Sequence, residues 1–323
     1  MTDDGSIDSV RRFACTACGA CCNRGPEMEL GEATSLASAF VTQLLFKVHS
    51  LPLYGRSRRT AQWSALQRSR LPPAEALDEE REHLRNFAAR ERIDKSKGRS
   101  LHLTITALTI DREQGRCPAL ADRQCSIYPS RPYSCRTVPM HYSRPASVLG
   151  GYLESFVGTP EYKCDVSPGA PVVFDGRSIA DASVAEARSE ALAMVRSEMR
   201  WKTAVAALMD DGRDALAAGL PTFDEVLRQS DAGYATVAPM LAAWRIGRDI
   251  GVLSPAAFRS VCRDQAALIK AELDRGPGLD AAANLVGLLF DYEQEGVGVP
   301  GAPAAGGGPN GAVNVLKSLL EQK

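Results

Sequence analysis

The sequence lacks several features that would assign it to a common class of protein. No stretch approaches the roughly 18 apolar residues that a membrane span requires. The formal net charge is −1, so nothing global attracts the chain to nucleic acid or to an acidic ligand. The C-terminal half contains no Ser/His/Asp set, no carboxylate pair and no glycine-rich phosphate loop. These absences argue against a membrane span, a nucleic-acid-binding role and the commonest kinds of active site.

The N-terminus lacks the apolar segment of a secretory signal. It reads Met-Thr-Asp-Asp-Gly-Ser-Ile-Asp-Ser and is acidic. We therefore expect a cytoplasmic protein, in which an extracellular disulfide framework is disfavoured. Thioredoxin-like redox chemistry needs two cysteines at the start of a helix, and this chain has eight spread over three clusters.

Cysteine is the residue that the sequence concentrates. Eight of its nine cysteines lie in the first 164 residues, and four of them stand in one octet. Two thiolates separated by two residues can turn their sulfurs toward one ion. Gly19, which follows the second cysteine, can take positive φ and aim amide hydrogens at sulfur. The predicted metal ligands are Cys15, Cys18, Cys21, Cys22, Cys117, Cys125, Cys135 and Cys164, although Cys164 could instead fill core space; Cys262 is interpreted as a core residue.

The segment between Cys125 and Cys135 predicts a support for this site. Its prolines stiffen the connection, and its tyrosines can cover the sulfurs. Arg131 and Arg136 would neutralise a thiolate-rich site from just outside it, unless they are ordinary residues of a surface turn. His141 is a secondary candidate, either as a ligand or as a hydrogen-bond donor to one.

The spacing leaves the metal open between an iron–sulfur cluster and zinc. Cys15-x₂-Cys18-x₂-Cys21 has the spacing of the first three ligands of a bacterial ferredoxin cluster, and Cys117-Pro118 could supply the fourth. A Cys-x₂-Cys pair followed by glycine is equally typical of a zinc knuckle. Eight thiolates could also serve two ions, or one cluster and one ion.

The combined pattern resembles a known family. The motif Phe13-Ala-Cys-Thr-Ala-Cys-Gly-Ala-Cys-Cys22, then Cys117-Pro118, Cys125-Ser-Ile-Tyr128, Arg131-Pro132 and Cys135-Arg136 are similar to the YkgJ-type cysteine-cluster proteins. The likeness covers roughly residues 10–165, and it implies a bacterial protein that chelates zinc or iron. The flagellin lysine methylases, which are associated with an iron–sulfur cluster, resemble the pattern more loosely, because the spacing of the first cysteines differs.

The sequence predicts an α+β fold that is mainly α-helical. Residues 1–175 would form a small cysteine-rich metal-binding domain, with a few short strands and a helical insertion at about 31–100. We expect helices over 31–50 and 74–93, and strands over 101–110, 151–157 and 170–174 that could form one small sheet under the cysteine loops. Residues 176–295 would form an α-helical bundle, and 296–323 a flexible tail rich in Gly, Pro and Ala.

Several helix boundaries in the C-terminal half carry capping signals. The expected helices span 181–209, 213–218, 222–230, 234–250, 255–275 and 280–294. Gly219 is a plausible C-cap, Thr222 and Glu225 form a capping box, and Ser254 is an N-cap before Pro255.

Two further segments bear on partners. A basic stretch between residues 54 and 70 could contact nucleic acid, but a solvated loop is the favoured interpretation. The helical half could bind an unknown protein partner, and the short apolar segment 313–320 could dock or fray.

Two functions of different kinds follow from the sequence. The favoured one is a metal-binding module whose cysteine site organises the N-terminal domain, or stores or senses metal. The alternative is an iron–sulfur enzyme that modifies a macromolecular substrate. An open coordination position would distinguish the second from the first.

Overall fold

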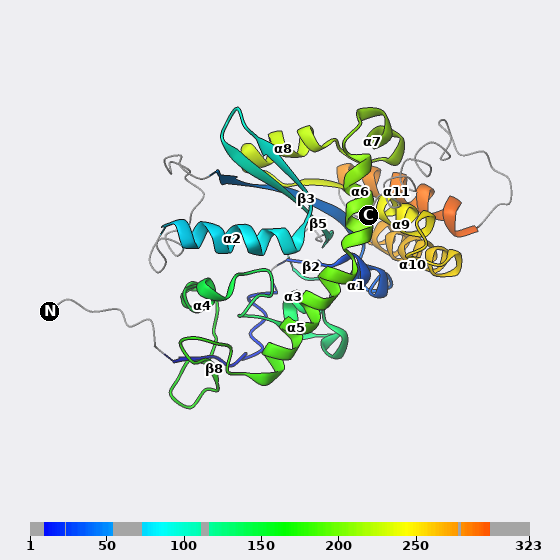
Figure 1. Cartoon of the computed structure of the whole chain (residues 1–323). Helices are drawn as coiled ribbons and strands as arrows, with labels where there is room; N and C mark the ends of the chain where they lie inside the picture. Colours follow the sequence, from blue (N-terminus) through cyan, green and yellow to red (C-terminus); the bar gives the residue numbers. More distant parts are fainter. Residues whose placement is uncertain (1–9, 23, 54–72, 111–115, 277–278, 298–323) are drawn as a thin grey trace.

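The computed structural model describes residues 10–22, 24–53, 73–110, 116–276 and 279–297. It confirms a mixed α and β fold that is mainly helical. Figure 1 places a strand-containing body in the upper part of the view and the cysteine-bearing loops in the lower part. Helices α5 (Ala182–Ser197) and α6 (Met199–Leu208) run along both parts. The predicted basic stretch and the tail beyond residue 297 lie outside the described residues.

A five-stranded antiparallel sheet lies at the centre of the upper part. Its two long strands, β3 (Thr42–Pro52) and β5 (Arg99–Thr109), pair along their whole length, with His49 opposite His102. The other strands are β2 (Glu27–Met28), β4 (Ala88–Asp94) and β9 (Thr236–Pro239). The prediction of strand β5 is confirmed, but the sheet is larger than the small one that we expected.

The helix predicted over residues 31–50 is wrong for most of its length. Helix α1 (Leu30–Ser35) is short, and the chain then continues as β3. Leu44 and Val48 are four residues apart, a spacing that fits both a helix and one face of a strand. Phe46, between them, is fully buried on that same face, as the two-residue period of a strand requires.

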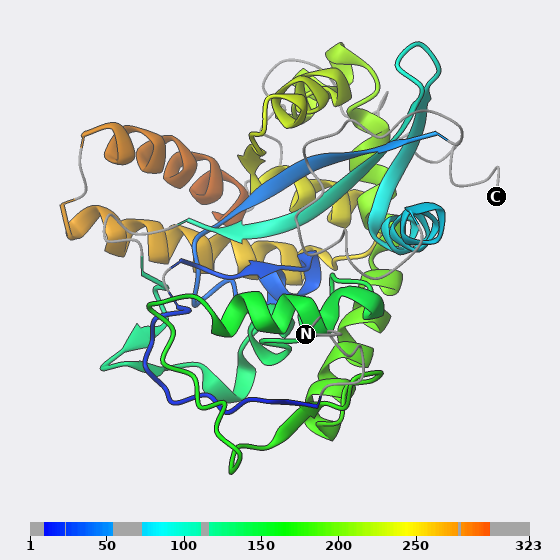
Figure 2. The same ribbon diagram turned by 90° about the vertical axis from the view of Figure 1, so that its left-hand side faces the viewer.

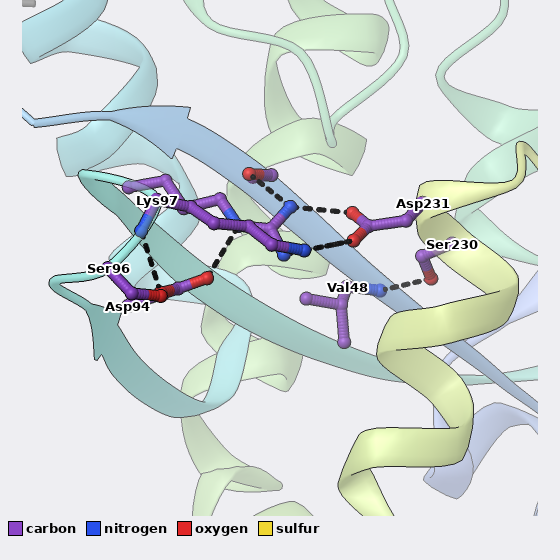
Figure 3. Close-up of polar contacts among 8 residues, drawn as sticks. Val48, Asp94, Ser96, Lys97, Ser230 and Asp231 are labelled. Atoms are coloured by element: carbon purple, nitrogen blue, oxygen red, sulfur yellow. Dashed lines mark hydrogen bonds and ion pairs between the residues drawn. The ribbon is translucent and has the colours of Figure 1, made fainter.

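The predicted helical insertion therefore contains both helices and strands. Helix α2 (Pro73–Phe87) ends before residue 93, and β4 follows it directly. The β4–β5 turn is fixed by Asp94, which accepts hydrogen bonds from Ser96 Oγ (2.6 Å) and from the amide of Lys97 (3.0 Å). Arg99 forms ion pairs with both Asp94 and Asp231. The hairpin is thereby held to helix α8 (Phe223–Asp231), whose last residue, Asp231, is labelled in Figure 3.

The C-terminal half confirms most of the predicted helices. After α5 and α6, the helices of this half are α7 (Gly212–Ala218), α8 (Phe223–Asp231), α9 (Met240–Asp249), α10 (Pro255–Asp274) and α11 (Leu279–Val297). The Thr222 capping box, the Ser254 cap and the left-handed Gly219 are as predicted. Two predictions need correction. The 181–209 helix breaks at Glu198, and residues 236–239 of the 234–250 helix form β9, which ends at Pro239.

The cysteine-bearing part consists of short elements. They are β1 (Arg11–Arg12), β6 (Leu120–Ala121), β7 (Gln124–Cys125), α3 (Tyr133–Arg136), α4 (Leu149–Val157) and β8 (Val172–Phe174), with single 3₁₀ turns at Tyr128–Ser130 and Ala146–Val148. The predicted strand at 151–157 is wrong, because it is helix α4. Leu149 and Leu153, one helical turn apart, are both buried. The expected small sheet does not form, because β5 joins the large sheet while β8 pairs with β1.

The described residues form one main hydrophobic core and three much smaller clusters. The main core joins the large sheet to α6, α9 and α10, and its largest buried side chains include Trp201, Trp244 and Tyr292. Strand β9 pairs with β3 across the predicted boundary at residue 175, so both halves of the chain share this core. A small satellite core around Leu149, Leu153 and Val173 supports the cysteine-bearing part. No helix in the described residues is long and apolar enough to cross a membrane.

Candidate metal centre

All nine cysteines are free thiols. Eight of them lie in the segments that form the short elements of the lower part, and Cys262 is buried in the main core as expected. The electrostatic interactions among these eight thiols divide them into two sets of four. We call Cys15, Cys18, Cys21 and Cys164 the first thiol group, and Cys22, Cys117, Cys125 and Cys135 the second thiol group.

The first thiol group forms where two distant segments pair. Ala14 and Asp165 exchange backbone hydrogen bonds of 2.8 and 3.0 Å, which sets Cys15 opposite Cys164. Figure 2 shows the N-terminal segment lying along the segment that leads to β8. Burial raises the pKa of Cys164 to about 11, and so does electrostatic repulsion from Cys18, Cys21 and Cys15. Cys164 therefore lies within electrostatic reach of the other three thiols of this group.

The loop that carries Cys18 has the geometry expected of a metal knuckle. The backbone amides of Ala20 and Lys163 donate hydrogen bonds to its sulfur and lower its pKa. Gly19 has φ of 74°, as predicted, and Ala17 also lies in the left-handed region. A Cβ at Gly19 would lie 3.5 Å from Leu120, so this loop rests on the β6–β7 hairpin.

The second thiol group gathers around that hairpin and α3. The amide of Cys117 donates to the carbonyl of Cys22 (2.9 Å), and Cys125 ends strand β7. The two-residue turn of the hairpin, Asp122 and Arg123, has positive φ at both positions. Burial raises the pKa of Cys135 to about 11, and repulsion from Cys117 and Cys125 adds to it. Cys22 lies within electrostatic reach of the same three thiols.

The two groups meet at the adjacent residues Cys21 and Cys22. The hydrogen bond between their thiols raises the pKa of Cys21 and lowers that of Cys22. Neighbours in sequence thus belong to different groups. Cys117, which the ferredoxin-like spacing offered as a fourth ligand for the first three cysteines, lies with Cys22, and Cys164 lies with Cys15.

Of the two arginines predicted to support the site, Arg131 lies near the thiols and Arg136 is paired with a carboxylate. Arg131 lies near both groups, because its charge favours ionised Cys21 and Cys135, and it stacks over the ring of Tyr128 at 4.2 Å. Arg136 instead forms an ion pair of 2.9 Å with Glu190 of α5.

The backbone amide and the hydroxyl of Ser143 lie 3.2 and 2.7 Å from Nδ1 of His141. The ring of His141 stacks on the ring of Tyr142. Burial lowers the pKa of His141 to about 4, so the ring is neutral at neutral pH.

A carboxylate that the sequence did not assign to the site holds the helix that carries Cys135. Glu32 Oε1 accepts a hydrogen bond from the amide of Tyr133, the first residue of α3 (2.6 Å). Glu32 also closes a capping box with Glu29. This contact joins residues 101 positions apart in the chain, so nothing in the sequence indicates it.

The donor set suits a soft metal. Each group supplies four thiols, the number that closes a tetrahedral zinc site or holds an iron–sulfur cluster. Among the described residues, no three or more His, Cys, Asp or Glu side chains are already arranged to hold an ion.

One comparison with known proteins gives a match to this part of the chain. Residues 14–165 match the family model CxxCxxCC, described as "Putative zinc- or iron-chelating domain", and this range includes all eight clustered cysteines. Searches of curated proteins and of solved structures find no match to the chain. The expected resemblance is confirmed over residues 14–165, which match the CxxCxxCC family model.

Proposed function

We propose that the protein chelates metal at two four-thiol sites, one formed by the first thiol group and one by the second. The observation that supports this most is the division of the eight thiols. Cys164 interacts electrostatically with Cys15, Cys18 and Cys21, whereas Cys22 interacts with Cys117, Cys125 and Cys135. Two sites of four ligands use every clustered cysteine and leave none over.

The ligand chemistry allows zinc or an iron–sulfur cluster at each site. The x₂-x₂ spacing of Cys15, Cys18 and Cys21 favours a cluster in the first thiol group, with Cys164 as the remote fourth ligand. The amide hydrogen bonds to Cys18 suit either metal, because both knuckles and clusters use amides to stabilise thiolate charge. Both metals require reduced thiols, which the cytoplasm maintains.

A metal-binding module fits this ligand count better than an enzyme does. Four protein ligands close a tetrahedral site, whereas a catalytic metal keeps a coordination position open for substrate. A catalytic zinc ion at either site would therefore require one of the four cysteines to leave the metal. A protein partner for the helical half stays a prediction.

Anaerobic purification with metal analysis and an optical spectrum tests the proposal. Iron–sulfur clusters would give brown protein with acid-labile sulfide, and zinc would give colourless protein with two ions per chain. Cys18→Ser should lose the metal of the first group and keep that of the second, and Cys125→Ser the reverse. Cys262→Ser, outside both groups, is the matched control and should keep all the metal. Full retention by Cys18→Ser or Cys125→Ser, or complete loss from Cys18→Ser, would contradict two separate sites.

A further inference from the structure

The two thiol groups are anchored very differently. Cys15 and Cys21 of the first group are exposed, whereas no cysteine of the second group is. A metal ion is released when competing ligands can reach the sulfurs that hold it and those sulfurs can move away. Exposure and anchoring of the ligands therefore predict how fast each site exchanges its metal.

The second thiol group is fixed to the main core from several sides. Cys117 and Cys125 pack against that core. The start of α3, two residues before Cys135, is held by Glu32 from α1, and Glu32 is itself buried. The end of α3 is held by the ion pair of Arg136 with Glu190 on α5. Movement of these sulfurs would disturb contacts that connect the two parts of the molecule.

The first thiol group rests on surface segments. Its two chain segments are joined by the bridge of Ala14 with Asp165, by hydrogen bonds between Lys163 and the side chains of Thr16 and Cys18, and further along by the short β1–β8 pairing. Phe13, next to this bridge, is partly buried at the edge of the satellite core and contacts the ring of Phe156. Val166, two residues after Cys164, is 50% exposed. A competing ligand can approach these sulfurs without opening the main core.

We propose that the metal of the first thiol group is exchangeable and is passed to a partner that presents thiolates, whereas the metal of the second group is a permanent part of the fold. This inference rests on the proposed function. Transfer would proceed by ligand exchange. The incoming thiol loses its proton and binds the metal as a thiolate, and the displaced cysteine thiolate takes up that proton. The balance requires no oxidant and no reductant.

Zinc release from the full chain tests this difference. Zinc-loaded protein is mixed with a coloured zinc chelator, and dithiothreitol serves as the thiolate probe in a parallel sample. We expect two phases of one ion each, the fast one at least about tenfold faster and accelerated further by the dithiol. The thermal midpoint should stay unchanged after the fast phase and fall after the slow one.

Variants assign the two phases. Cys18→Ser should abolish the fast phase alone. Arg136→Gln, which keeps all eight thiols, should accelerate the slow phase by about tenfold and leave the fast phase unchanged. A single common rate for both ions, or a fast phase that survives in Cys18→Ser, would overturn the inference while two bound ions still support the proposed function. Loading of fewer than two ions would instead refute the proposed function.

Discussion

The upper and lower parts of the molecule are held together by different means. The upper part, which we call the sheet region (residues 26–110 and 199–297 as described), has a continuous apolar core shared by β3, β5 and several helices. The cysteine region (residues 10–22 and 116–175) has two-stranded pairings, short helices and small clusters such as the satellite core, and it meets the main core at Cys117, Ala119 and Cys125. Small folds that cannot bury enough apolar surface are commonly stabilised by metal or disulfide cross-links. The thiol groups lie in the part of the chain that needs such cross-links.

A buried ion pair should give the largest effect, and it belongs to the sheet region. Lys202 and Glu29 form an ion pair with about 1% of each side chain exposed, and the hydroxyl of Tyr142 also donates to Glu29. Lys202→Met leaves the carboxylate buried without its cation, and we expect the free energy of unfolding to fall by about 3–5 kcal/mol. Urea unfolding measures this. The double variant Lys202→Met with Glu29→Gln should recover most of the loss; if it recovers none, the charge is not the cause.

A matched pair of leucines compares the two regions directly. Leu103 in β5 and Leu153 in α4 are both almost fully buried. Leu103→Ala should lower the free energy of unfolding by about 2–5 kcal/mol, with metal or without it. Leu153→Ala should be costly only in the metal-loaded protein, because we expect the cysteine region to be already loosened when metal is absent. Circular dichroism during urea unfolding of both forms measures this. Equal costs for Leu153→Ala in the two forms would show that the satellite core needs no metal.

The junction between the regions should make stability depend on pH. Burial, with repulsion from Glu29, raises the pKa of Glu198 to about 7, above its ordinary value of 4.5. The folded state therefore favours the protonated carboxyl, and its stabilising contribution is lost as pH rises from about 4.5 through about 7. We expect the free energy of unfolding to fall by about 1–3 kcal/mol over this interval.

Glu198→Gln should flatten this pH dependence. Leu30 and Gly31 donate their backbone N–H groups to different oxygens of the carboxylate, and the amide keeps an acceptor for one of them. Denaturant unfolding at about pH 5 and about pH 7 measures the slope. Glu32, whose pKa is also raised to about 7 chiefly by burial, should retain part of the dependence. An unchanged slope in Glu198→Gln would exclude Glu198 as its source.

The smallest effect should come from a helix cap far from the cysteines. Thr222 Oγ1 accepts a hydrogen bond from the amide of Glu225 at the start of α8 (3.2 Å). Thr222→Ala should cost about 1 kcal/mol, and Thr222→Ser, which keeps the hydroxyl, much less. Metal content should be the same in both variants. Loss of metal from Thr222→Ala would show that the two regions are more tightly coupled than their separate cores indicate.

Local signals made much of the fold predictable. Caps at Gly219, Thr222 and Ser254 mark helix ends by hydrogen bonds between near neighbours, and the alternation in 101–110 marks a strand by its two faces. The strand β3 was missed because its Leu44 and Val48 fit two periods at once. Helix α4 was missed because its β-branched and aromatic residues outweighed the helical spacing of Leu149 and Leu153.

The candidate site was predictable in its residues but not in its division. The spacing of Cys15, Cys18 and Cys21 predicted them as ligands, because two cysteines separated by two residues suit one metal. The other five were predicted from their clustering and from the family resemblance. Whether Cys22 joins its neighbour Cys21 or the distant Cys117 depends on the pairing of Ala14 with Asp165 and on the β6–β7 hairpin. Those contacts join segments far apart in the chain. The role of Glu32 was hidden for the same reason.

Hydrogen exchange with and without metal tests most directly whether the two regions are held by different means. Backbone amides of residues 10–22 and 116–136 should be protected in the loaded protein and should exchange nearly freely once the metal is chelated. Amides of β3 and β5 should stay protected in both forms, because the main core does not depend on the thiols. Equal protection of the cysteine region in both forms, or a loss of protection in β3 and β5 on chelation, would contradict the account.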